Sequence, residues 1–235
     1  MMGPEYAEVV RDFAEFGVTA FTTTRAFGTV SSASTEPANV VASRWDAIRD
    51  AAKAAGVDRL ATSHQVHGAA VLEHNVRWHG WLRAGDADGH HSATRGTALG
   101  VTIADCVPIF IAHPSGAVAL LHSGWRGTVA RIVERGIGAF VSRGARAADL
   151  RMHLGPAICG KCYEVSADVA TQLLGLPQSA SRAVDLRGLI ADHARAAGVR
   201  QITMSPLCTK CDNARFFSHR AGDAGRQVAV ILASS

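Results

Sequence analysis

Two histidines and one cysteine stand at the ends of apolar segments, and their types suit a metal ion. They are His67 in the segment QVHG, Cys106 in ADCVP and His122 in HSGWRG. A residue that ends a buried strand is held firmly while it still faces a cleft, so catalytic groups are often found there. Two imidazoles and a thiolate suit Zn²⁺, and three protein ligands leave a fourth tetrahedral position open for water or substrate. His67, Cys106 and His122 are therefore candidates for a catalytic zinc site.

The spacing alone also fits a structural role for the same three residues, because no short motif brings them together. His67 would then cap a turn, Cys106 would be a small buried hydrophobe and His122 a hydrogen-bonded core histidine. The segment after His122 adds a second feature. Its glycines lead into an expected helix, whose free backbone N–H groups can bind an anion, and Arg126 offers a planar fork for phosphate or carboxylate. An ordinary strand-to-helix turn anchored by Trp125 explains this segment equally well.

Four other cysteines form two CxxC pairs, Cys159 with Cys162 and Cys208 with Cys211. Two such pairs can build a tetrahedral Cys₄ structural zinc site. The separation between the pairs exceeds the usual spacing of a zinc ribbon, so reduced thiols and a redox-active disulfide remain open alternatives.

The apolar patterns predict the elements that would position these groups. Residues 98–104 are predicted as a buried strand that ends at Asp105-Cys106, and residues 117–121 as a strand that ends at His122. Residues 60–72 are predicted as two short strands that turn at His67-Gly68. Residues 73–93 are polar and rich in histidine, so we expect a long excursion that could act as a lid. The other predicted elements are strands at 17–24, 109–111, 201–204 and 227–232, and helices at 37–55, from 128 onward, at 165–176 and at 186–197.

The composition is that of a globular protein with enough apolar residues for one sizeable core. The chain has 235 residues, of which 48% are hydrophobic, and no linker or low-complexity tract divides it, so we expect one domain over residues 1–235. The net charge of +4 comes from scattered arginines without a basic run, which argues against nucleic acid. No segment is apolar enough to span a bilayer or to form a signal core. We therefore expect a cytoplasmic protein, monomeric or a small homo-oligomer, that binds no membrane.

The ordered motifs resemble those of the YfiH-like laccase-domain family. The resemblance covers nearly the whole chain, and its most specific part is ADC followed by HSGWRG. Members of the family are described as purine nucleoside phosphorylases with adenosine deaminase activity, as polyphenol oxidases and as a peptidoglycan editing factor. The motif segments that carry the resemblance are TTR at 23–25, QVHG at 65–68, ADCVP at 104–108, HSGWRG at 122–127, GPAICGKCYEV at 155–165 and FFSHR at 216–220, followed by Gly225-Arg226.

The resemblance implies roles for individual residues. The histidine of QVHG, the cysteine of ADC and the histidine of HSGWRG match the family's zinc ligands, so it assigns the metal to His67, Cys106 and His122. Asp88 is the nearest match to a family aspartate, although its surroundings depart from the usual pattern. The remaining candidates for binding substrate or phosphate are Arg25, Arg126, His219 and Arg220.

The function implied by the resemblance is a zinc-dependent purine nucleoside enzyme. It would carry out phosphorolysis of adenosine, inosine or methylthioadenosine and deamination of adenosine, with zinc to activate water and arginines to orient phosphate. One alternative is a cysteine hydrolase that acts on amides of peptidoglycan precursors through Cys106 and a histidine. Copper-dependent oxidation of phenols ranks lower, because multicopper centres need paired HxH histidines and none occurs here. A non-catalytic binding module is the alternative from another class.

The resemblance also implies a fold, namely an α+β domain in which two mixed sheets stack between helices in four α/β/β/α layers. The residue patterns by themselves indicate only that strands and helices mix along the chain.

Overall fold

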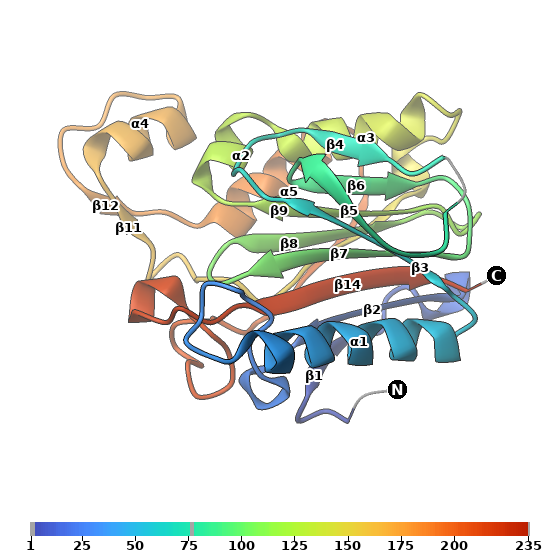
Figure 1. Ribbon diagram of the computed structural model, residues 1–235. Coiled ribbons are helices and arrows are strands. Elements are labelled where there is room, and N and C mark those ends of the chain that lie inside the picture. Colours follow the sequence, from blue (N-terminus) through green and yellow to red (C-terminus); the bar gives the residue numbers. More distant parts are fainter. Residues whose placement is uncertain (1–2, 76–77, 235) are drawn as a thin grey trace.

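Two six-stranded sheets of mixed strand direction form the centre of the protein (Figure 1). The computed structural model describes residues 3–75 and 78–234. The first sheet has the order β1 (Ala7–Val10), β2 (Val18–Thr23), β14 (Gln227–Ala233), β7 (Thr97–Ile103), β3 (Arg59–His64) and β5 (Gly80–Asp86). The second has the order β13 (Gln201–Met204), β10 (Arg151–Leu154), β8 (Val107–Ala112), β9 (Val118–Ser123), β6 (Gly89–Ser92) and β4 (Val71–Glu73). A small pair, β11 (Glu164–Val165) and β12 (Arg182–Ala183), lies apart from both.

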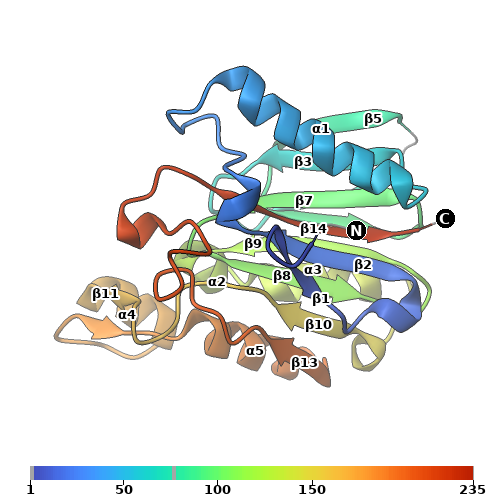
Figure 2. The same cartoon turned by 90° about the horizontal axis from the view of Figure 1, so that it is seen from below.

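Helices cover the outer faces of the two stacked sheets. Helix α1 (Ala38–Ala54) covers the first sheet, and α2 (Trp125–Val129), α3 (Ile132–Val141) and α5 (Leu186–Ala196) cover the second, as Figures 1 and 2 show from two sides. Helix α4 (Ala167–Leu174) sits with β11 and β12 in a lobe at one end. Short 3₁₀ turns occur at Ala14–Phe16, Arg25–Phe27, Ala147–Asp149 and His219–Ala221. The expected α+β fold with α/β/β/α layers is confirmed.

The layers follow from alternation along the strands, which sends successive side chains to opposite faces of a sheet. In β14, Ala229 and Ile231 point into the core between the two sheets, whereas Val228 and Val230 pack toward α1. All seven residues of β14 are buried, because both faces of this strand are covered. Helix α1 buries one stripe at three- and four-residue spacing, formed by Val41, Trp45, Ile48 and Ala52.

The predicted excursion at residues 73–93 is wrong, because the segment contains β5 and β6. All four residues of β6 are buried although their sequence is Gly-His-His-Ser. His90 can lie in the core because both of its ring nitrogens have partners, at 2.9 Å from His74 Nε2 and 3.1 Å from Ser63 Oγ. A polar sequence therefore forms a buried strand between β9 and β4, and residues 73–75 and 78–93, the described part of this segment, do not form the expected lid.

Two further predictions change in detail. The strands predicted within residues 60–72 exist, but β3 belongs to the first sheet and β4 to the second, so the turn at His67 passes from one sheet to the other. The helix expected from Thr128 begins earlier, at Trp125, and is broken into α2 and α3 at Arg131, whose φ is 60°. Among the described residues, no helix combines the length and the apolarity that crossing a membrane requires.

Candidate metal centre and its cavity

His67, Cys106 and His122 meet at one point although they come from three separate segments. One ligand atom from each lies within 4.8 Å of the others. His67 follows β3, Cys106 lies in the turn between β7 and β8, and His122 is on β9. The rings of His67 and His122 are nearly perpendicular, with centroids 4.8 Å apart. The three side chains thus offer two nitrogens and one sulfur at the spacing of a metal site.

Gly124 allows this close approach. A Cβ atom at this position would come within 2.9 Å of Cys106 Sγ and 3.4 Å of His67 Cδ2. A side chain here would therefore collide with the converging groups, so the first glycine of HSGWRG is required for steric reasons.

Asp88 holds two of the three candidate ligands in place. Its carboxylate accepts hydrogen bonds from the backbone N–H groups of Val66, His67 and Gly68, at 3.2, 3.0 and 2.7 Å. The same carboxylate lies 2.8 Å from His122 Nδ1, which leaves Nε2 of that ring free to face Cys106. His67 has a φ of 58°, a conformation that is strained for a non-glycine residue, and the bonds to Asp88 stabilise it.

The expectation that Asp88 binds substrate is corrected by this geometry. Its side chain is fully buried, and its oxygens are occupied by protein donors. Burial alone would raise the pKa of Asp88, but hydrogen bonds from His122 and from the backbone of Gly68 and Val66 lower it below its usual value. Asp88 is therefore a positioning residue that stays ionised.

The thiol of Cys106 and the ring of His122 are electrostatically coupled. Burial alone would raise the pKa of Cys106, yet the charge of His122 and hydrogen bonds from His122 and His67 lower it to about 6. Burial alone would lower the pKa of His122, yet Cys106 and Asp88 raise it to about 9. The environment therefore favours a thiolate, which is the form that binds metals and attacks electrophiles.

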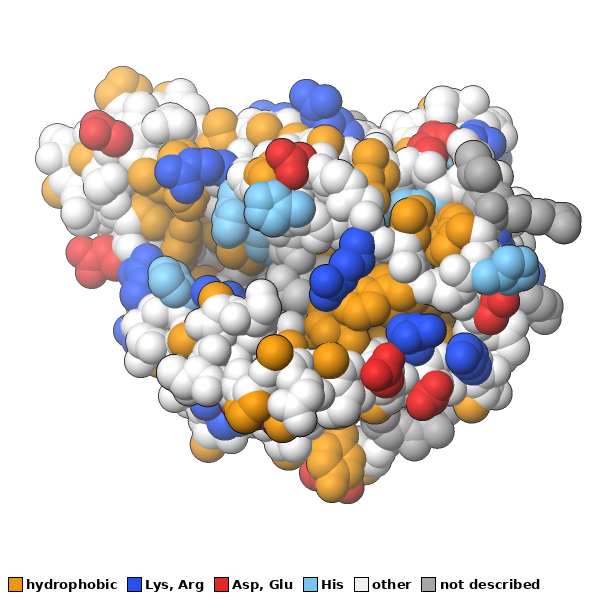
Figure 3. All heavy atoms as spheres, viewed as in Figure 1, with side chains coloured by type: hydrophobic (Ala, Val, Ile, Leu, Met, Phe, Trp, Pro, Cys, Tyr) orange, Lys and Arg blue, Asp and Glu red, His pale blue; other side chains and the backbone are white. Residues whose placement is uncertain are grey.

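The three groups line a cavity of about 500 Å³ that opens to solvent. Trp125, Ile158 and Tyr163 supply apolar and aromatic walls, and Arg126 and Arg220 are exposed within it. In Figure 3 the surface is hollowed beside the lobe that carries α4, with basic side chains on the rim. The full lining comprises Gln65, His67, Thr102, Ala104, Asp105, Cys106, His122, Gly124, Trp125, Arg126, Ile158, Tyr163, Leu186, His219, Arg220 and Arg226.

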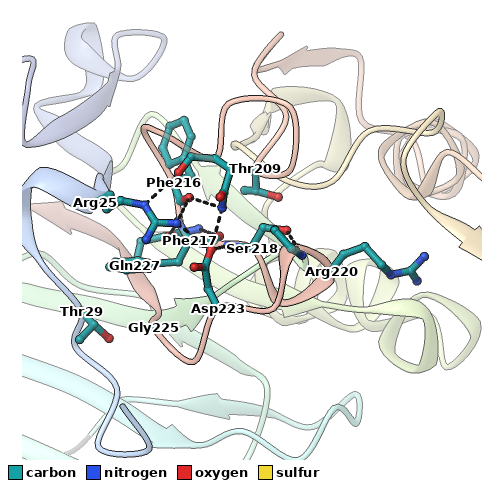
Figure 4. A network of polar contacts seen from close by, with 12 residues as sticks. Arg25, Thr29, Thr209, Phe216, Phe217, Ser218, Arg220, Asp223, Gly225 and Gln227 are labelled. Carbon is teal, nitrogen blue, oxygen red and sulfur yellow. Dashed lines mark hydrogen bonds and ion pairs between the residues drawn. The ribbon is translucent and has the colours of Figure 1, made fainter. Parts of the chain in front are cut away.

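Arg25 does not belong to this lining, contrary to the expectation that it binds phosphate. Its guanidinium donates to the backbone oxygens of Asn213 and Phe216 at 2.9 and 3.0 Å, and it forms an ion pair with Asp223 at 2.7 Å. It also lies over the ring of Phe217, 4.4 Å from the centroid. Figure 4 shows that these contacts hold residues 213–223, the segment that contains Arg220. Arg25 thus positions the segment that carries His219 and Arg220.

Several lining residues were not singled out from the sequence, although they stand inside the recognised motifs. Asp105 is the clearest case: its φ is 81°, and its carboxylate accepts hydrogen bonds from Thr209 Oγ1 at 2.6 Å and from the N–H of Arg220 at 2.7 Å. This arrangement fixes the turn that presents Cys106. Gln65, Tyr163 and Arg226 are further examples, and Thr102, which stands outside the motifs, also lines the cavity. The two CxxC pairs also converge, at a place outside the cavity lining.

Comparison with known proteins gives concordant results. Residues 19–234 match the model of the family described as multi-copper polyphenol oxidoreductase laccase. A purine nucleoside phosphorylase from Deinococcus radiodurans is 37% identical over 186 residues, which cover 74% of this chain and 70% of that protein. An adenosine deaminase, RL5, from an unknown prokaryotic organism is 32% identical over 188 residues, 70% of each chain.

Solved structures share the fold. The structure of YlmD from Geobacillus stearothermophilus superimposes with a TM-score of 0.83 at 27% identity, covering 99% of this chain and 94% of that one. The structure of YfiH from Bacillus licheniformis superimposes with a TM-score of 0.84 at 24% identity, covering 98% and 97%. The chain therefore belongs to the YfiH-like laccase-domain family.

Proposed function

We propose that the protein is a zinc-dependent enzyme that cleaves purine nucleosides with phosphate and deaminates adenosine. The substrates of the first reaction would be adenosine, inosine and methylthioadenosine. The observation that carries the proposal is the convergence of His67, Cys106 and His122 in a cavity lined by arginines and aromatic side chains. The names of the relatives support both the phosphorylase and the deaminase activity.

The donor set fits zinc. Two imidazoles and a thiolate are borderline-soft ligands, the carboxylate of Asp88 orients one imidazole, and exposed His67 leaves one side of the group open to the cavity. A bound zinc ion would supply a Lewis acid that activates water or polarises a substrate oxygen. His67, Cys106 and His122 would hold it.

The other cavity residues have separate tasks in this proposal. Arg126 and Arg220 would hold phosphate, while Trp125 and Tyr163 would pack on the purine. In phosphorolysis a phosphate oxygen forms a bond to the ribose C1′ as the bond to purine N9 breaks, and the base leaves with the electron pair. His219 is the candidate donor of the proton that the departing purine takes up. In deamination, water supplies the oxygen that replaces the amino group at C6, which leaves as ammonia.

Metal analysis combined with product assays tests this proposal. Chelated protein is expected to lose both inosine formation from adenosine and phosphate-dependent release of purine base, and to regain both with zinc. His67→Ala should lower both activities at least about 100-fold, whereas His79→Ala, which changes an exposed histidine that pairs with Asp58, should not. Full activity in protein stripped of metal, or restoration by copper alone, would rule the zinc mechanism out.

The coupled Cys106 and His122 pair supports a second candidate, a cysteine hydrolase that acts on amides of peptidoglycan precursors. The thiolate sulfur would attack the amide carbonyl, His122 would protonate the departing amine, and water would then hydrolyse the thioester. A metal-free sample that cleaves such an amide and loses that activity when an electrophile modifies Cys106 would favour this candidate.

A further inference from the structure

We infer that Cys159, Cys162, Cys208 and Cys211 form a structural zinc site, separate from the group at His67, Cys106 and His122. The sulfur atoms of the four cysteines all lie within 4.8 Å of one another. Zinc–sulfur bonds of about 2.3 Å in a tetrahedron place the sulfurs about 3.8 Å apart. The four side chains are thus close to the arrangement that the ion requires. This inference does not depend on the proposed purine nucleoside activity.

The backbone around the cysteines is folded as a metal-binding turn requires. The N–H groups of Cys159 and Cys211 point at Cys208 Sγ, at 3.2 and 3.4 Å, and such bonds stabilise a thiolate. The N–H of Cys162 donates to the carbonyl oxygen of Cys159 at 2.9 Å, which closes the first turn. The carboxylate of Asp212 accepts from the N–H of Cys208 at 3.0 Å and holds the second turn. Both CxxC segments therefore present their sulfurs to a common centre.

The charges of the neighbouring residues match the proposed ion. Zinc bound by four thiolates carries a net charge of −2. Each CxxC segment contains one lysine, Lys161 in the first and Lys210 in the second, and these are two of only three lysines in the chain. Two ammonium groups beside such a complex offset its charge. Four thiolates this close together without a cation would instead repel one another.

The position of the cluster indicates what the zinc would do. It joins the segment after β10 to the segment after β13, which also contact each other at a bridge between Ala157 and Cys208. The first segment supplies Ile158 and Tyr163 to the cavity wall. The second supplies Thr209, which bonds to Asp105 beside Cys106. The zinc would therefore clamp two walls of the catalytic cavity together.

Zinc content per chain tests the inference, with variants that remove one site at a time. Cys106→Ser removes a ligand of the first group only, and Cys211→Ser changes an exposed residue of the cysteine cluster only. We expect two zinc ions per chain in the wild type, one in either variant and none when both changes are combined with His67→Ala. Circular dichroism would establish that each variant is folded. Folded, reduced Cys106→Ser protein that binds no zinc would overturn the inference.

Two further measurements separate the alternatives. Cobalt-loaded Cys106→Ser protein is expected to show the strong thiolate-to-metal absorption of a tetrahedral sulfur site, and cobalt-loaded Cys211→Ser protein to lose most of it. Titration of the unfolded wild type without reductant should find five thiols. A count of three or one would reveal disulfides in place of the metal and overturn the inference. Failure of the purine nucleoside assay would leave these measurements unaffected.

Discussion

Asp88 shows at the scale of single residues how one buried carboxylate arranges a whole site. It is bonded to His122 on β9 of the second sheet and to the backbone of the turn that carries His67 after the first sheet, so it fixes two candidate ligands from separate parts of the fold. A neighbour that orients a metal ligand typically contributes about 10- to 100-fold to metal affinity or activity. Asp88 should therefore be nearly as important as the ligands themselves.

Asp88→Asn tests this role. The amide keeps the shape but loses the charge, and its NH₂ group opposes backbone N–H donors. We expect zinc affinity and activity to fall about 10- to 100-fold, measured by competition with a chelating dye and by turnover of adenosine. Asp46→Asn, which changes an exposed carboxylate on α1, is the control. Unchanged zinc affinity in folded Asp88→Asn protein would show that Asp88 does not position the ligands.

The sequence indicates the candidate ligands better than it indicates the residues around them. His67, Cys106 and His122 are recognisable because their types suit a metal and because motifs surround them. The roles of Asp88 and Arg25 depend on burial and on partners about 20 and 190 positions away, which no local pattern contains. Both residues belong to the neighbourhood of the site, but as positioning residues and not as binding residues.

At the scale of elements, strands made of apolar runs are predictable from the sequence, whereas strands made of buried polar residues are not. The strand around Val230 follows from its continuous apolar run, and the helix around Trp45 follows from apolar residues at three- and four-residue spacing. The strand β6 escapes prediction because His90 is satisfied by partners on other segments. The order of strands within each sheet depends on pairing between distant segments, so local sequence patterns do not predict it.

Arg25 holds the segment between β13 and β14 through Asn213, Phe216 and Asp223. Figure 4 shows the guanidinium of Arg25, from the turn after β2, paired with the carboxylate of Asp223 in this segment. Arg25→Met and Asp223→Asn should both raise the KM for phosphate by a similar factor, because each releases His219 and Arg220. Each should also destabilise the fold by about 1–2 kcal/mol, measured by urea unfolding.

The matched control for this pair is Arg49→Met with Asp46→Asn, an exposed ion pair on α1. Its removal should change stability by less than about 1 kcal/mol and leave KM unchanged. If Arg25 contacted phosphate directly, Arg25→Met alone would raise KM while Asp223→Asn would not. That pattern would contradict the positioning role.

At the scale of the whole molecule, the candidate metal centre lies where the two sheets meet. His67 follows a strand of the first sheet, His122 is on a strand of the second, and Cys106 is in the turn between β7 and β8, which joins them. A bound ion would therefore tie the two layers together, and metal binding should stabilise the fold by mass action. The second sheet also contains a group of buried histidines whose protonation opposes folding.

His91→Leu tests how far these histidines lower the free energy of unfolding at acid pH. Burial lowers the pKa of His91 to about 4 and that of His90 to about 3, whereas an unfolded histidine titrates near about 6.5. The unfolded chain therefore binds more protons below pH ~6.5, and the free energy of unfolding falls as the pH decreases toward about 4.

Neither ring nitrogen of His91 has a partner among the described residues, so replacing His91 by leucine should lower the stability little at pH ~7. Urea unfolding at a series of pH values gives the slope of the free energy of unfolding against pH. In His91→Leu this slope should be smaller than in the wild type by up to about 1.4 kcal/mol per pH unit. An unchanged slope would mean that His91 is protonated in the folded protein.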